Sequence, residues 1–161
     1  MRNIIDFNDG WLFEGRDRVR LPHNVVDLPF NYFDEKVYQR PFTYEKTFTF
    51  DPAWTGREVT VHFEGAMANA EVRLDGQLIA RHADGYTPFT ARLSDCTPGE
   101  HVLTVTIDGS ENPAIPPFGN VIDYLTYAGI YREVRLEVAP ALHIRNVKIE
   151  TPNVLCAPRA S

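Results

Sequence analysis

Apolar and polar residues alternate along most of this chain, and this two-residue period constrains its fold more than any other feature. Between Phe42 and Phe50 the aromatic side chains fall at every second position but one. Successive side chains of a strand point to opposite faces, so these aromatic residues share one face. The same period recurs in further runs, whose apolar positions are Val59, Val61 and Phe63; Ala70, Val72 and Leu74; Leu103, Val105 and Ile107; and Val134, Leu136 and Val138.

Turn residues separate these runs. Asp75-Gly76 stands between two strand-like segments and predicts a type I′ hairpin. Thr55-Gly56, Pro98-Gly99 and Asp108-Gly109 mark further bends. No long window keeps a helical period, and Trp11 and Phe13 alternate like a strand that enters the core. The sequence therefore predicts an all-β sandwich or barrel.

Composition fits one ordinary globular domain with a tail. The 161 residues are 43% hydrophobic and 24% charged, which argues against disorder. The 16 basic and 22 acidic residues give a net charge of −6, so nucleic acid is not an expected partner. No apolar stretch reaches the roughly 20 residues of a membrane span, and no membrane partner is expected.

The N-terminal residues and the cysteines indicate a reducing compartment. The chain begins at Met1 and reaches Asp6 without the apolar stretch of a secretory signal. Cys96 and Cys156 are far apart and have no metal-ligand spacing, which predicts two reduced thiols. We therefore expect a cytoplasmic protein.

Two long segments are poor in strand signal, namely 17–40 and 109–129. Both contain prolines and several aromatic residues, which disfavours disorder and is typical of functional loops. After Pro140, residues 143–151 predict one more strand, with a break in phase near Arg145. We expect 1–140 to be one domain and 141–161 to begin a second, truncated one.

Several short motifs resemble one family. They are Leu21-Pro22-His23, Trp54-Thr55-Gly56-Arg57, Val61-His62-Phe63-Glu64-Gly65, Gly85-Tyr86-Thr87-Pro88-Phe89 and Gly129-Ile130-Tyr131-Arg132. Their order and spacing resemble the N-terminal sugar-binding domain of glycoside hydrolase family 2, which includes β-galactosidases, β-glucuronidases and β-mannosidases. The resemblance covers roughly residues 11–151. It implies a jelly-roll β-sandwich similar to galactose-binding domains.

The resemblance also implies the partners of this domain. In whole enzymes of the family an immunoglobulin-like domain follows, then a TIM barrel, and Leu142–Thr151 is similar to the first strand of that second domain. The barrel supplies the two glutamates of retaining hydrolysis, so no residue of this chain is assigned a catalytic role and the chain alone should be inactive. The full enzyme is expected to act on a carbohydrate substrate, to form a homo-oligomer and to hold sodium or magnesium. No cofactor is expected in this chain.

Asp123 is the main candidate for sugar binding. It lies six positions before Gly129, and in similar enzymes an aspartate at this spacing reaches the sugar site and bonds a hydroxyl. An ionised carboxylate is a strong acceptor for such bonds, although a loop aspartate can equally cap a turn. Further candidates are Asn120 and Tyr124 beside it, and Asn31 and Tyr32 in the other long loop.

Three functions remain open. The first is a fragment of a β-glycosidase, with β-galactosidase ahead of β-glucuronidase. The second is a free-standing carbohydrate-binding module, and the third is a sandwich with no ligand. Other prominent residues have structural interpretations: Tyr86 and Phe89 should buttress the sandwich, and Arg132 should pair with a carboxylate or with carbonyls.

Overall fold

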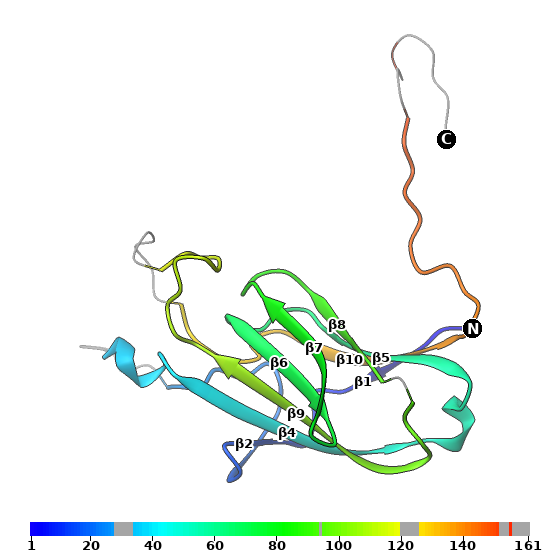
Figure 1. Cartoon of the computed structure of the whole chain (residues 1–161), viewed down its shortest axis with the longest axis horizontal. Helices are drawn as coiled ribbons and strands as arrows, with labels where there is room; N and C mark the ends of the chain where they lie inside the picture. The colour runs from blue at the N-terminus through cyan, green and yellow to red at the C-terminus, as the bar shows by residue number, and fades with distance from the viewer. Residues whose placement is uncertain (28–33, 94, 120–125, 152–154, 156–161) are drawn as a thin grey trace.

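The computed structural model describes residues 1–27, 34–93, 95–119, 126–151 and 155. They form two antiparallel sheets packed face to face (Figure 1). One sheet has the order β1(Asn3–Asp6), β10(Val134–Pro140), β5(Arg57–Phe63), β8(Phe89–Arg92). The other has the order β3(Asp17–Val19), β2(Trp11–Phe13), β4(Pro41–Phe50), β9(Gly99–Asp108), β6(Asn69–Leu74), β7(Gln77–Ala83). The only helical elements among the described residues are the 3-10 turns η1(Glu35–Val37) and η2(Pro52–Trp54). The predicted all-β jelly-roll sandwich is confirmed.

The core follows the predicted alternation. On β4 the side chains of Phe42, Tyr44, Phe48 and Phe50 are buried, while those between them are at least partly exposed. The apolar positions predicted on β5, β6, β9 and β10 are buried as well. Trp11 lies fully inside the core, as expected for a strand entering it. Each such side chain contributes roughly 1.5–3 kcal/mol by leaving water.

The hairpin at Asp75-Gly76 is confirmed. Both residues have positive φ, 48° and 84°, as a type I′ turn requires, and the turn joins the paired strands β6 and β7. Three strands were not predicted, namely β1, β3 and β8. β3 falls inside the segment expected to be loop. These strands have three or four residues each, too few for a clear alternation.

The strand expected over 143–151 is wrong. Residues 142–151 leave the sandwich as an extended segment beyond β10 (Figure 1), and the structure assigns no strand to them. Leu142, Ile144, Val147 and Ile149 are 64–95% exposed. A strand needs a neighbour to satisfy its backbone groups, and no other described segment pairs with this one. The division into 1–140 and 141–161 stays a prediction.

Two further sequence expectations concern cysteines and membranes. Cys96 is a free, partly buried thiol, and Cys156 lies outside the described residues. No helix in the described ranges is long and apolar enough to cross a membrane.

Candidate functional site

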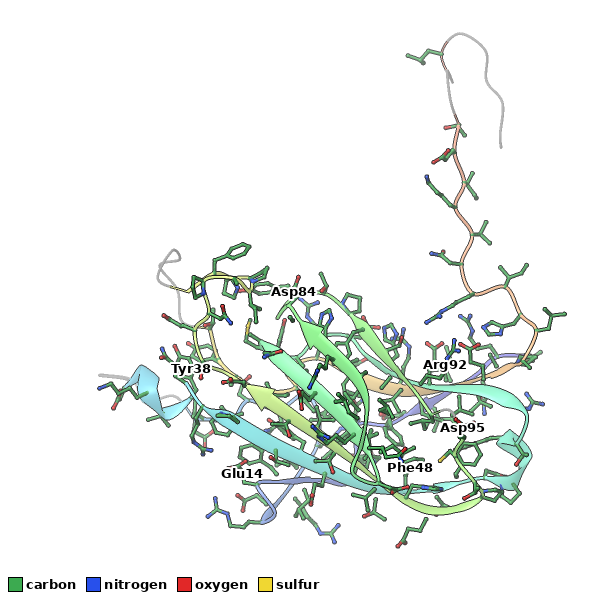
Figure 2. The ribbon with its side chains drawn as sticks, in the orientation of Figure 1. Glu14, Tyr38, Phe48, Asp84, Arg92 and Asp95 are labelled. Carbon is green, nitrogen blue, oxygen red and sulfur yellow. The ribbon has the colours of Figure 1, made fainter. Side chains whose placement is uncertain are left out.

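The two long loops meet at one end of the sandwich. The rings of Tyr38 and Tyr127, one from each loop, form an edge-to-face pair with centroids 6.2 Å apart. At the start of the second loop, the amide of Gly109 donates to the carbonyl of Arg40, 3.2 Å away. Figure 2 shows Tyr38 at this end, whereas Asp95 lies towards the other. Segments far apart in the sequence therefore form one surface.

A cavity of about 70 Å³ lies under the second loop. The beginning of β6 and the end of β9 form its floor, through Asn69 and Asp108. Its other described lining residues are Met67, Ala68, Gly109, Ser110, Glu111, Asn112, Ile115, Pro117, Gly119 and Thr126. The described lining carries two carboxylates and two amides and contains no Lys, Arg or His. Such groups suit the hydroxyls of a neutral sugar.

Local hydrogen bonds shape the loop around this cavity. Asp108 accepts from the amide of Ser110 at 2.9 Å, and the side chain of Asn112 accepts from the amide of Ala114 at 2.9 Å. These are the turns that Asp and Asn form with their own backbone. The Glu111 carboxylate is exposed and bonds no other described residue. Glu111 is therefore the carboxylate of the lining that is free to meet a ligand.

The segment that follows the second loop is held from both sides. On one side, the amides of His23 and Val25 donate to the carbonyls of Ile130 and Ala128, at 2.8 and 3.1 Å. On the other side, Met67 and Gly129 exchange both backbone bonds, at 3.0 and 3.3 Å. Residues 128–130 thus lie between two other segments of the same chain and pair with both. These bonds fix the position at which the second loop ends.

Two of the sequence motifs bond each other at this point. The Tyr131 hydroxyl donates to the carbonyl of Gly85, and Nη1 of Arg132 donates to the carbonyl of Tyr86 at 3.1 Å. Arg132 also reaches the carbonyl of Glu64 at 3.4 Å. The prediction that Arg132 pairs with carbonyls is confirmed. The motifs of the sequence are therefore an interlocking set of structural contacts.

The buttressing prediction holds for one of its two residues. Phe89 stacks on Phe63 with centroids 4.7 Å apart and on His82 at 4.5 Å. Tyr86 is 37% exposed and lies at the surface, and its buttressing role stays a prediction. Its carbonyl, bonded to Arg132, joins the loop to the body.

The predicted sugar-binding residues Asp123, Asn120, Tyr124, Asn31 and Tyr32 lie outside the described residues, so these assignments stay predictions. Sequence reasoning missed Glu111, Asn69 and Asn112 as lining residues. The available signals were the position of Asn69 at the start of a strand and that of Glu111 and Asn112 inside the second long loop. In the described ranges, no group of three or more His, Cys, Asp or Glu residues is arranged to hold a metal ion.

A second hollow, of about 420 Å³, lies on the outer face of the sheet that contains β5 and β10. Several of its charged side chains pair with one another. Arg135 pairs with Glu137 at 2.8 Å and with Glu64, and Arg2 lies 3.9 Å from Glu137. None of its described lining residues belongs to either long loop, so the cavity beside those loops is the better candidate site.

Known proteins resemble this chain over most of its length. Residues 8–140 match the family model described as "Glycosyl hydrolases family 2, sugar binding domain". The β-galactosidase of Rhizobium meliloti is 46% identical, over 96% of this chain and 22% of its own length. That of Thermoanaerobacterium thermosulfurigenes is 40% identical, over 96% and 24%.

Solved structures share the fold. Bacteroides uniformis β-glucuronidase 2 superposes with a TM-score of 0.80 at 22% identity, over 95% of this chain and 20% of its own. At this identity the likeness concerns the fold alone. The chain therefore spans only about a quarter or less of each of these relatives.

Proposed function

This chain belongs to the family described as the sugar-binding domain of glycosyl hydrolases family 2. We propose that it is the sugar-binding domain of a β-galactosidase. In that role the domain braces a catalytic TIM barrel encoded elsewhere in the protein, and its long loops contribute to the sugar site. The observation that carries the proposal is an oxygen-rich cavity lined by the second loop, at the end of the sandwich where the two long loops meet. An immunoglobulin-like domain after residue 140, a homo-oligomeric whole enzyme and a cytoplasmic location belong to the same proposal.

The choice of a galactoside has two supports. The relatives with 46% and 40% identity are named β-galactosidases, whereas the β-glucuronidase structure shares 22%. The cavity gives an independent reason. A glucuronide carries a carboxylate that would need a cationic partner, and the described lining offers Asp108 and Glu111 instead. β-Glucuronidase is therefore the second candidate.

The role of this chain in the reaction is to bind and orient. Retaining hydrolysis uses two carboxyl groups about 5–5.5 Å apart, which the barrel would supply. Asp123 would accept a hydrogen bond from a sugar hydroxyl, and such a bond lowers the barrier if it tightens in the transition state. This proposed role of Asp123 is supported by Gly119 and Thr126, which precede and follow it in sequence and both line the cavity.

Sodium or magnesium in the whole enzyme also belongs to the proposal. The described residues contain no group of three or more His, Cys, Asp or Glu side chains arranged to hold an ion, and no step of the reaction is assigned to one.

The test compares the full-length protein with the 161-residue chain. The full-length protein should hydrolyse nitrophenyl β-galactoside faster than the glucuronide, and the chain alone should hydrolyse neither. Turnover that copurifies with the chain alone and scales with its amount would refute this assignment. Calorimetry with galactose separates the remaining alternative: a dissociation constant of millimolar or tighter for the chain alone would favour a free-standing carbohydrate-binding module.

A further inference from the structure

His23 and Tyr44 form a partly buried polar pair near the end of the second loop. Tyr44 lies on β4 and is fully buried, and its hydroxyl is 2.9 Å from Nδ1 of His23. His23 itself lies in the first long loop and pairs through its backbone with Ile130. The pair therefore connects the core of the larger sheet to the segment that follows the second loop.

Both groups of this pair are uncharged if the Tyr44 hydroxyl donates its proton to Nδ1 of His23. Burial raises the pKa of Tyr44, and the backbone of Ile130 acts in the opposite direction, as an N–H near the hydroxyl oxygen does. We assign the protons of the pair in this way. A histidine that accepts at Nδ1 is neutral and carries its proton on Nε2.

The surroundings of the imidazole favour the neutral form. Its ring packs on Phe13, with centroids 4.9 Å apart, and burial lowers the pKa of His23. Asp27 and Asp17 act in the opposite direction with smaller effects. Burial, and to a smaller degree the charge of Glu14, raises the pKa of Tyr44. No described residue of 128–131 brings an ionisable side chain to His23.

Protonation would reverse this arrangement. With a proton on Nδ1, the Tyr44 hydroxyl would face two donors and its own hydrogen would lose its acceptor. A buried polar group without a partner costs about 1–3 kcal/mol. The backbone bonds of residues 23–25 to 128–130 lie directly against this pair, so they are the contacts that weaken.

We propose that His23 is a positioning residue, and that with Tyr44 it forms an acid-sensitive latch that holds residues 128–130 in place and thereby orders the sugar site. The effect on the sugar rests on the proposed function; the latch itself does not. The neutral latch holds at pH 6.5 and above. It opens as the pH falls below that value, through the lowered pKa of His23 in the folded protein.

Hydrogen exchange measured by mass spectrometry on the full-length protein tests the latch. Corrected for intrinsic rates, exchange of a peptide covering 128–131 should rise about tenfold as the pH falls from 7 to 4.5. His23→Asn keeps an acceptor near the position of Nδ1 but does not titrate, so its exchange should be slow and independent of pH. His23→Leu and Tyr44→Phe should exchange fast at every pH, and the double variant should be no faster than either.

Kinetics on nitrophenyl β-galactoside test the coupling to the site. On the acid side, KM should rise about threefold to tenfold in the wild type and stay flat in His23→Asn, with kcat changing less. His62→Asn is the matched control, because burial also lowers the pKa of His62 and it lies on the outer sheet face. It should behave as the wild type.

Each outcome decides one claim. An exchange profile of His23→Asn that follows the wild type would overturn the latch. Exchange as expected with a KM that ignores His23 would overturn its positioning role. A full-length protein without galactosidase activity would refute the proposed function, and the exchange data would still decide the latch.

Discussion

The carbonyl oxygen of His23 occupies the space in which a side chain on Gly129 would begin. An added Cβ at Gly129 would lie 2.5 Å from that oxygen and 3.2 Å from Cα of Asn24. Gly129 also has a φ of +135°, which L side chains rarely adopt. The first long loop can therefore lie directly against the end of the second because glycine stands at this position.

Gly129→Ala should destabilise the protein by about 2–5 kcal/mol, from backbone strain together with overpacking. Gly15→Ala is the control. Gly15 also has a positive φ, +68°, but an added Cβ meets nothing within 4 Å, so the cost should be about 1 kcal/mol. Urea denaturation of both variants measures the difference. Equal losses of unfolding free energy in the two variants would show that the close contact with His23 does not contribute to the cost.

Asp123→Ala in the full-length protein should reduce kcat/KM by roughly tenfold to several hundredfold. A carboxylate bond lost from a desolvated sugar site costs about 1.5–3 kcal/mol, whereas a lost turn cap costs roughly 1 kcal/mol of folding stability. Asp84→Ala is the control, because Asp84 accepts from the amides of Tyr86 and Thr87, at 2.7 and 3.3 Å. It should lower the Tm and leave kcat/KM nearly unchanged. The reverse pattern for Asp123→Ala would make it a turn residue.

Glu111→Gln should weaken discrimination against anionic sugars. A unit charge about 4 Å from a uronate contributes on the order of 1 kcal/mol even in water, so inhibition by glucuronate should tighten about fivefold. Inhibition by galactose should change less than twofold. Glu100→Gln, at the opposite end of β9, is the matched control and should change neither constant. Unchanged inhibition by glucuronate would remove Glu111 from the site.

His101 should make the free energy of unfolding depend on pH in the opposite sense to His23. Its two ring nitrogens lie 2.6 Å from Oδ2 of Asp75 and 2.7 Å from the carbonyl of Thr97, and both partners accept only. His101 is therefore an imidazolium, and the bond to Asp75 raises its pKa above 6.5. This stabilisation is complete below pH 6.5 and is lost as the pH rises through the raised value.

His101→Gln should thus cost on the order of 1 kcal/mol at pH 6 and much less at pH 9. Chemical denaturation of both proteins at several pH values measures the difference in their free energies of unfolding. A difference that stays constant from pH 6 to pH 9 would contradict the imidazolium assignment.

Local pattern predicted the parts of this fold that are themselves local. The alternation on β4 identified the faces of Phe42 and Tyr44, and Asp75-Gly76 identified its hairpin. The same alternation over 143–151 was misleading, because a period of two shows which residues could share a face but does not supply a neighbouring strand.

The candidate site was only partly predictable for a related reason. The lengths and aromatic content of the two loops marked them as functional. Their meeting depends on contacts such as Tyr38 with Tyr127 and Val25 with Ala128, whose partners are distant in sequence. Glu111 could be assigned to the site only from the structure, in which it lines the same cavity as Asn69.

The hydrogen bonds between distant residues near the candidate site also determine the order in which parts of this domain can fold. The side chain of Asn8 accepts from the amide of Val134, 126 residues later, and Arg132 reaches back 46 residues to Tyr86. Contacts of such sequence separation make folding slow, because a large loop must close before they form. On the ribosome, the β6–β7 hairpin can form early, but the end that holds the candidate site must wait until residue 134 has emerged. Until then the core surfaces of the nascent sheets stay uncovered, and this is the interval in which the domain most needs protection from aggregation.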